Sequence, residues 1–313
     1  MTPLVSTVIP TRNRAAMLAF AVRSALAQTD ANGDPVSQEI IIADDCSTDN
    51  TLAVALALKQ EQPERVRYRR VQTGTPGGTR NAGAKFATGK YLAFLDDDDA
   101  WLPGRLTKAL TAFAASPQAG FVYAQATPTD AFLHPASDSR NDFPLLPLPE
   151  GHPVGAFLAS PPHLNATLFR RDAFELVGGF NATLSGFEDA DLMIRMVRRY
   201  PCVAVQEPLA LMRTHADSLN SGVKVWQRFQ DELRARRFHL SVRDDYRPNF
   251  AERLRLSLRC RGWYVSRFLG AVERATRREE VREGVRYALR TSPLHALKSP
   301  LLWRALMMKG GNS

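Results

Sequence analysis

The sequence Tyr91-Leu92-Ala93-Phe94-Leu95-Asp96-Asp97-Asp98-Asp99 joins an apolar run to four consecutive carboxylates. The run of aromatic and aliphatic residues predicts a buried strand. The carboxylates at its end repel one another by roughly 1 kcal/mol per pair at about 4 Å, even in water. A hard divalent cation such as Mg²⁺ or Mn²⁺ prefers oxygen ligands and would offset this repulsion. The alternative for the same residues is a solvated acidic turn or a helix cap ahead of Trp101.

The chain ahead of this segment alternates strand and helix patterns. The expected strands are 4–9, 39–43, 66–71 and 91–95, and the expected helices are 14–28, 51–60 and 77–86. This order predicts a parallel, doubly wound α/β sheet, in which ligands bind beyond the carboxyl ends of the strands. Asp44 and Asp45 fall at the same edge as the four aspartates, which favours a site there. We expect one of these two, Asp44 by preference, to cap the following helix instead.

Beyond the aspartates the pattern remains mixed. We expect helices at 105–115, 171–177 and 192–200, strands at 120–126 and 165–169, and an extended run at 203–212. The segment 127–162 is rich in Pro, Ser and Asp and predicts a long loop that serves as a substrate lid. From Trp226 onward the pattern is helical and rich in arginine. The expected organisation is therefore an α/β domain over 1–223 and a basic helical C-terminal extension over 224–313.

The composition is that of a soluble globular protein, with 44% hydrophobic and 23% charged residues in a chain of 313. No apolar run approaches the ~20 residues needed to cross a bilayer. The amino terminus lacks the pattern of a signal peptide. The three cysteines are far apart and show no metal-ligand spacing. These features predict a cytoplasmic location.

The charge is unevenly distributed along the chain. Residues 224–313 carry 21 Lys and Arg against 9 Asp and Glu, whereas residues 1–223 carry 20 against 23. Such asymmetry indicates an anionic partner for the tail. Arginines alternate there with Leu, Trp, Tyr and Phe, a composition that suits an anionic membrane surface and a peripheral position at the inner face of the plasma membrane. A helical bundle packed on the rest of the protein is the alternative. No recognition motif supports nucleic-acid binding.

With these residues placed, the chain resembles the family 2 glycosyltransferases of GT-A fold over about residues 3–216. Seven motifs stand in the family's order and at its spacing. They are VIPTRNR (8–14), IADDCSTDNT (42–51), GGTRNAG (77–83), LDDDD (95–99), VGGF (177–180), FEDADL (187–192) and RTH (213–215).

The resemblance implies a Rossmann-like GT-A fold and the transfer of a sugar, with inversion, from a nucleotide-diphosphate sugar to an acceptor hydroxyl. It implies Mg²⁺ or Mn²⁺ as cofactor, held by Asp98 and His215. It implies Asp189 as general base, with Glu188 as the competing candidate or as the residue that orients the acceptor. The residues implied to bind the nucleotide sugar are Pro10, Thr11, Arg12, Asp45, Gly78, Arg80, Asp96 and Asp97.

Two neighbouring carboxylates have simpler expected roles. We expect Asp99 to cap the next helix and Asp191 to complement the dipole of its own helix. Many relatives carry an aromatic residue near Arg12 to stack on the base. The arginine here could stack through its guanidinium plane, and the identity of the nucleotide base is therefore left open.

The resemblance further implies a UDP-sugar as the first donor to consider and a lipid-linked or saccharide acceptor, in bacterial surface polysaccharide or glycolipid synthesis. A Gln-x-x-Arg-Trp motif and membrane helices, which processive synthases carry, are both absent, so we expect addition of a single sugar. Two alternatives remain. A metal-dependent nucleotidyltransferase would carry a Gly-rich basic signature after the first strand. A non-catalytic membrane adaptor on a transferase fold would have lost the acidic residues.

Overall fold

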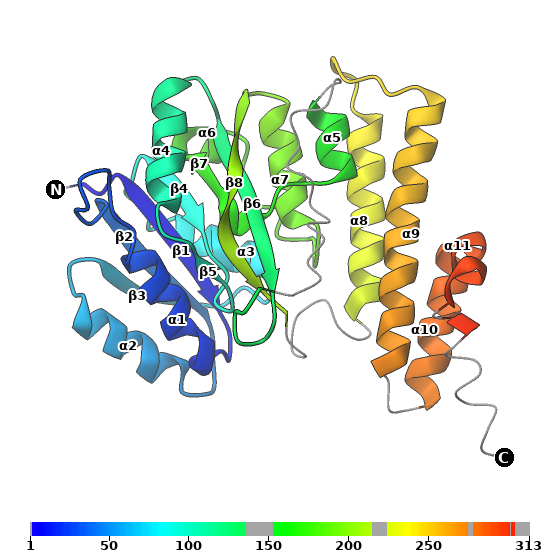
Figure 1. Cartoon of the computed structure of the whole chain (residues 1–313), viewed down its shortest axis with the longest axis horizontal. Helices are drawn as coiled ribbons and strands as arrows, with labels where there is room; N and C mark the ends of the chain where they lie inside the picture. Colours follow the sequence, from blue (N-terminus) through cyan, green and yellow to red (C-terminus); the bar gives the residue numbers. More distant parts are fainter. Residues whose placement is uncertain (1, 136–152, 215–223, 275–277, 301, 304–313) are drawn as a thin grey trace. The chain divides into compact units, whose positions relative to one another are not determined.

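Figure 1 shows the computed structural model of the chain, which describes residues 2–135, 153–214, 224–274, 278–300 and 302–303. The chain divides into two units, Met1–His215 and Ala216–Ser313. The first unit holds the α/β fold, and the second is helical over its described residues. The roles expected for the two parts, divided near residue 223, remain predictions.

The first unit is built on an eight-stranded mixed sheet with the strand order β3-β2-β1-β4-β7-β6-β8-β5. Its strands are β1 (Val5–Thr11), β2 (Gln38–Asp45), β3 (Val66–Val71), β4 (Tyr91–Phe94), β5 (Ala100–Trp101), β6 (Phe121–Thr129), β7 (Thr167–Arg170) and β8 (Cys202–Arg213). β1 pairs in parallel with β2 and β4, and β2 pairs in parallel with β3. The carboxyl ends of these strands therefore meet at one edge, and the expected α/β class with a mostly parallel sheet is confirmed.

The other half of the sheet departs from the parallel pattern. β7 is antiparallel to both β4 and β6, β6 and β8 are parallel, and β5 is antiparallel to β8. β5 contains two residues, which is too short for any periodicity to predict. Its pairing brings the end of the acidic segment next to β8.

Helices cover both faces of the sheet. Those of the first unit are α1 (Ala15–Leu26), α2 (Thr51–Glu61), α3 (Pro76–Ala84), α4 (Arg105–Ala115), α5 (Pro153–Ala159), α6 (Arg171–Leu176) and α7 (Glu188–Val197), with the 3-10 turn η1 (Leu164–Ala166) before β7. Val5 and Ile9 of β1 lie in one core with Leu18 of α1. Val8 points to the opposite face, where a Cβ on Gly83 of α3 would lie 2.5 Å from Val8 Cγ1. The doubly wound arrangement follows from this alternation.

The expectation of one continuous loop over 127–162 is wrong at both of its ends. β6 continues through Thr129, and residues 153–159 form α5 with Val154, Phe157 and Leu158 buried. A helix of seven residues, about two turns, offers too few periods to stand out in a segment rich in Pro. Residues 136–152, where most of the expected lid falls, lie outside the described residues.

The second unit has a hydrophobic core of its own. Its helices are α8 (Lys224–Ser241), α9 (Phe250–Arg274), α10 (Arg278–Thr291) and α11 (Pro293–Lys298). Phe229, Tyr264 and Leu269 are buried in this core, and the Tyr264 hydroxyl donates to Glu232 Oε2 at 2.6 Å. None of the helices in the described part of the chain is long and apolar enough to span a membrane.

Candidate active site

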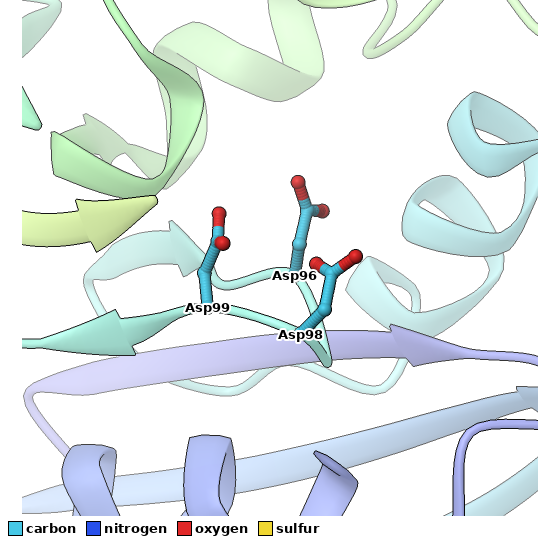
Figure 2. A group of neighbouring side chains, drawn as sticks. All are labelled: Asp96, Asp98 and Asp99. Carbon is cyan, nitrogen blue, oxygen red and sulfur yellow. The ribbon is translucent and has the colours of Figure 1, made fainter. Parts of the chain in front are cut away.

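The four aspartates form a turn between β4 and β5 rather than a helix cap. The Asp99 amide donates to the Asp96 carbonyl at 3.1 Å, which closes the turn. Asp96, Asp98 and Asp99 each offer a carboxylate oxygen, and these oxygens lie within 4.8 Å of one another. Figure 2 shows the three side chains rising from the turn to the same side. The expected capping role of Asp99 is wrong, since α4 begins after Gly104 and the Asp99 side chain is buried in this cluster.

Two residues distant in sequence hold this turn in place. Asn165 is fully buried; its Oδ1 accepts from the Asp96 amide at 3.1 Å and its Nδ2 donates to Asp99 Oδ2. The Arg213 amide donates to Asp99 Oδ1 at 2.7 Å, and Arg213 Nε donates to the Asp98 carbonyl at 2.7 Å. The sequence identified Asn165 only as part of a strand and Arg213 only as part of the RTH motif. No pattern in the sequence around Asn165 or Arg213 predicts their hydrogen bonds to the acidic turn.

The carboxylates of the turn differ in charge state. Burial, and after it the neighbouring Asp98 carboxylate, raises the pKa of Asp97 to about 8. Burial and the surrounding aspartates also raise the pKa of Asp99 well above its usual value. Burial acts in the same direction on Asp96, but the charge and hydrogen bond of Arg80 outweigh it and lower the Asp96 pKa. A cluster that holds protons because its charges are crowded and dehydrated fits a divalent cation, whose own charge would release them.

Arg80 connects this turn to α7. Its guanidinium donates to Asp96 Oδ1 at 2.6 Å and to Glu188 Oε1 at 2.8 Å, and only 7% of its side chain is exposed. Burial alone would lower the pKa of Arg80, but Asp96 and Glu188 raise it. Arg80 lies in α3, whose first turn is capped by the Thr75 hydroxyl, which accepts from the Gly78 amide at 3.2 Å. The Gly78 amide is thus engaged by the cap.

Glu188 and Asp189 begin α7 in different surroundings. Phe187 precedes them with φ of +70°, an uncommon left-handed conformation for a residue with a side chain. Glu188 is buried against Arg80, whereas Asp189 is partly exposed and its Oδ1 accepts from the Ala190 amide at 2.7 Å. Asp191 pairs with Arg195 at 2.8 Å within the helix. Of the two competing candidates, Asp189 is therefore the more accessible carboxylate.

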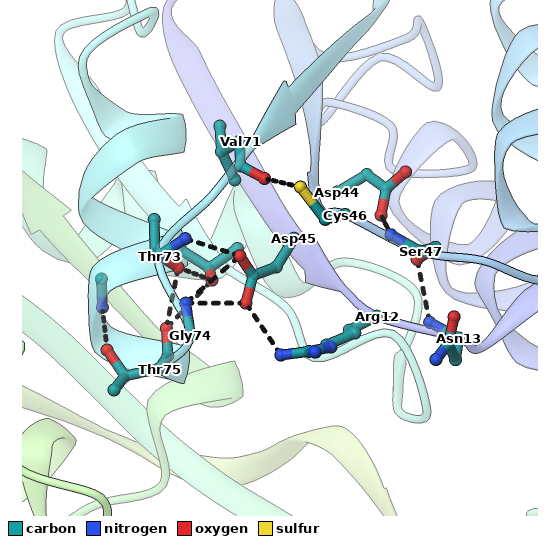
Figure 3. Close-up of polar contacts among 12 residues, drawn as sticks. Arg12, Asn13, Asp44, Asp45, Cys46, Ser47, Val71, Thr73, Gly74 and Thr75 are labelled. Atoms are coloured by element: carbon teal, nitrogen blue, oxygen red, sulfur yellow. Dashed lines mark hydrogen bonds and ion pairs between the residues drawn. The ribbon is translucent and has the colours of Figure 1, made fainter.

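A second group of predicted residues lies at the ends of β1 and β2 (Figure 3). Asp45 Oδ1 accepts from the Thr73 amide at 2.7 Å, and its Oδ2 accepts from the Gly74 amide at 3.0 Å and lies 3.6 Å from Arg12. The Arg12 side chain is 60% exposed. Thr11 is buried at the end of β1, and Pro10 lies within that strand opposite Ala43.

Asp44 holds its loop without capping α2. Its Oδ1 accepts from the Ser47 amide at 2.9 Å and its Oδ2 accepts from the Tyr68 hydroxyl at 2.7 Å. The expected helix cap is wrong, because α2 begins after Asn50 without a side-chain cap. Asn13 and Cys46, which lead out of β1 and β2, have φ values of +54° and +55°. Backbone strain of this kind gathers at binding sites.

The fold brings the two groups to one edge. β1 lies between β2 and β4, and Arg14, at the start of α1, lies 3.8 Å from Asp98. His163 was not among the predicted residues. Burial lowers its pKa, while the charges of Asp96 and Asp98 act in the opposite direction, so the imidazole lies close enough to the acidic turn to interact with its charges. The predicted metal ligand His215 lies outside the described residues.

Comparisons with known proteins agree with the resemblance seen in the sequence. The family model described as Glycosyl transferase family 2 matches residues 6–178. A Campylobacter jejuni protein named GalNAc(5)-diNAcBac-PP-undecaprenol beta-1,3-glucosyltransferase is 37% identical over 108 residues, 34% of this chain and 33% of its own length. The chain spans about a third of the length of three of the first four curated relatives.

Two solved structures resemble the chain over most of its length. The mannosyltransferase PcManGT of Pyrobaculum calidifontis, in complex with GDP-Man and Mn²⁺, has a TM-score of 0.61 at 19% identity and covers 98% of this chain and 84% of its own. S. aureus TarS 1-349, in complex with UDP-GlcNAc, has a TM-score of 0.60 at 16% identity and covers 93% and 82%. At these identities the likeness shows a shared GT-A fold.

Proposed function

This chain belongs to glycosyl transferase family 2, and from that premise we propose that it moves a single sugar from a nucleotide-diphosphate sugar to an acceptor hydroxyl, with inversion at the anomeric carbon. The observation that carries the proposal is the position of Arg80 between Asp96 and Glu188. This link joins the cluster suited to a cation with the helix that carries the candidate base. Inverting transfer needs a donor diphosphate and a base in one site.

The metal role falls on the acidic turn. Asp98 would hold Mg²⁺ or Mn²⁺ with His215, and Asp96 and Asp99 offer oxygens within the same reach. When bound, the ion would supply the positive charge that stabilises the departing nucleoside diphosphate. Asp97, whose side chain is buried, would support the turn.

The remaining predicted residues would divide between the donor and the acceptor. Asp45, Thr11 and Arg12 lie where a nucleoside would reach the ends of β1 and β2, with Pro10 and Gly78 beside that path. Asp189 would take the proton of the acceptor hydroxyl. Glu188, which pairs with Arg80, would orient the acceptor. Asp189 suits the first role because its carboxylate is partly exposed at a helix start.

The substrates are proposed by class. A UDP-sugar is the first donor to test, with a GDP-sugar second, because the two similar structures are named with UDP-GlcNAc and GDP-Man. A lipid-linked or saccharide acceptor suits the Campylobacter relative, whose name contains an undecaprenol carrier. We place the reaction in bacterial surface polysaccharide or glycolipid synthesis. The protein would work in the cytoplasm, with the second unit at an anionic membrane surface.

The deciding experiment is a thermal-shift screen of nucleotide sugars with Mn²⁺ or with EDTA, followed by analysis of the released product. We expect one donor to raise the melting temperature with Mn²⁺ and not with EDTA, and to release a nucleoside diphosphate. Asp98→Ala should lose that response, whereas Asp34→Ala, an exposed aspartate far from the turn in sequence, should keep it. Full activity in EDTA would contradict the metal role, and release of pyrophosphate would indicate a nucleotidyltransferase.

A further inference from the structure

An apolar surface is exposed at the end of the second unit. We define the α10–α11 patch as the exposed apolar side chains of residues 286–303, namely Leu289, Leu294, Leu297 and Trp303. Leu294 is 72% exposed, and Leu297 and Trp303 are each about half exposed (49% and 48%). Side chains of this size are seldom left in water together unless something covers them.

The patch is ordered by its own contacts. Trp303 Nε1 donates to the Leu297 carbonyl at 2.9 Å, which holds the indole against the carboxyl end of α11. On the other side of α11, Ala296 is buried in the core. A Cβ on Gly262 of α9 would lie 3.1 Å from the His295 ring. The leucines therefore face outward because α11 is fixed by its inner face.

The charged residues of segment 284–303, which contains the patch, all have one sign. Arg286, Arg290 and Lys298 are exposed within the same segment. Residues 284–303 contain no Asp or Glu. Arginine and lysine beside exposed leucine and tryptophan form the composition of an interfacial helix, whose cations meet lipid phosphates while the apolar side chains enter the headgroup layer.

The apolar surface extends along α9. Phe250, Leu254 and Leu258 follow one another at four-residue spacing and are 81%, 47% and 42% exposed. Arg261, one turn further along that face, donates to the Thr291 carbonyl at 2.7 Å. The exposed face of α9 thus leads to the end of α10, and Arg255, next to Leu254 in sequence, is also exposed.

We propose that the α10–α11 patch docks on an anionic lipid bilayer, with Leu294, Leu297 and Trp303 in the headgroup region and Arg286, Arg290 and Lys298 against lipid phosphates. Both an anionic bilayer and an RNA would complement the cations of the patch. Only the bilayer would also remove the leucines from water, so we assign the patch to lipid. The inference deepens the proposed membrane contact and does not depend on the chemistry of the acidic turn.

The test is flotation of the full chain with vesicles of phosphatidylglycerol or of phosphatidylcholine. We expect binding to phosphatidylglycerol that falls steeply with salt. Leu294→Gln combined with Leu297→Gln should weaken it at least tenfold, and Arg290→Gln with Lys298→Gln should reduce the preference for the anionic lipid. Leu176→Gln, which removes a leucine of α6 that is 67% exposed, is the matched control and should bind like the wild type. A blue shift of fluorescence on binding should shrink in Trp303→Phe.

Three results would overturn the proposal. They are unchanged vesicle binding by the leucine double variant, equal binding to both lipids, and a self-association in sedimentation velocity that the double variant abolishes. The last result would assign the patch to a second copy of the chain. Asp98→Ala should still bind vesicles, so a failure of the transferase proposal is distinguishable from a failure of this one.

Discussion

Asp96 and Asp97 are neighbours in sequence, yet the fold shifts their pKa values in opposite directions. The carboxylate of Asp96 meets the Arg80 guanidinium, whereas the Oδ2 atom of Asp97 has no hydrogen-bond partner among the described residues. Burial raises the pKa of Asp97 to about 8, so this group is protonated near neutral pH. Without a cation, the number of acidic residues therefore overstates the negative charge of the turn, and a bound divalent ion would lower these pKa values and release the protons.

Arg80→Gln is expected to destabilise the first unit strongly. The change would leave Asp96 and Glu188 buried without their cation, and breaking a buried pair from one side costs about 3–5 kcal/mol. Urea denaturation measures this loss. Arg23→Gln is the matched control, because it removes an exposed arginine 3.3 Å from Glu61 and should cost about 0–1 kcal/mol. Equal losses in the two variants would show that the Arg80 pairs contribute nothing beyond surface charge.

Asp189→Asn is expected to abolish transfer while sparing the donor. Loss of a general base costs about 10²–10⁴-fold in rate, and an amide cannot accept the proton. Nucleotide affinity by calorimetry should stay near that of the wild type. Asp191→Asn is the control, since Asp191 faces Arg195 within the helix and should leave transfer close to normal. Loss of nucleotide binding in Asp189→Asn would assign that residue to the donor site instead.

The residues that carry charge could be predicted from the sequence, but the residues that hold them could not. Asp45, Asp96 and Asp98 stand out because carboxylates at strand ends are visible in a linear pattern. Asn165 is visible only as one more polar residue, and its bonds to Asp96 and Asp99 exist because β7 returns antiparallel to β4. Long-range hydrogen bonds leave no trace in local periodicity.

At the scale of the element, prediction succeeded where a strand is buried on both faces. β2 is buried along its whole length, and the apolar run 40–43 within the predicted strand 39–43 marks it plainly. β8 was expected only as an extended run, because its middle is exposed and lacks a regular alternation. β5 and α5 were missed because each is too short for its pattern to repeat. The parallel half of the sheet, which carries most of the predicted residues, was predicted in both its strands and their direction. β6 and β7 were also predicted as strands, at 120–126 and 165–169, but their antiparallel pairing was not.

The opposite edge of the same strands carries a polar network that predicts acid sensitivity. Glu39 Oε1 accepts from the Ser6 and Thr88 hydroxyls at 2.7 and 2.6 Å, and joins β1 and β2 to the residues before β4. Burial raises the pKa of Glu39, but the hydrogen bonds of Thr88 and Ser6 outweigh burial and lower it below 4.5. Because the folded-state pKa is the lower one, the stabilisation is complete above about pH 4.5 and is lost as the pH falls through the folded value.

Glu39→Gln should therefore cost most at neutral pH and little in acid. Hydrogen bonds to a charged group contribute about 1.5–3 kcal/mol, which sets the expected loss at pH 7. The free energy of unfolding at pH 7 and pH 3 measures the difference between the two proteins. A loss of the same size at both pH values would mean that the carboxylate charge is not what stabilises the network.

At the scale of the whole molecule, charge and core follow the same division. The core that contains Ile9, Ile42 and Leu168 lies within Met1–His215, and the core that contains Phe229, Tyr264 and Leu302 lies within Ala216–Ser313. The excess of basic residues falls in the second part of the chain. Because the second unit has its own hydrophobic core, it can fold as a unit. Because its net charge differs from that of the first unit, it can bind a different kind of partner.

Calorimetry should accordingly resolve two unfolding transitions with different ligand responses. Ligand present at 100 times its dissociation constant stabilises a folded unit by about 2.7 kcal/mol. For the first unit, Met1–His215, each kcal/mol raises the melting temperature by roughly 2–4 °C. Donor nucleotide with Mn²⁺ should shift one transition, and phosphatidylglycerol vesicles should shift the other. Asp98→Ala should remove the first shift and keep the second, while the Leu294/Leu297 glutamine variant should do the reverse. A single transition that responds to both ligands would show that the two cores unfold as one, and would tie lipid binding energetically to the site at the acidic turn.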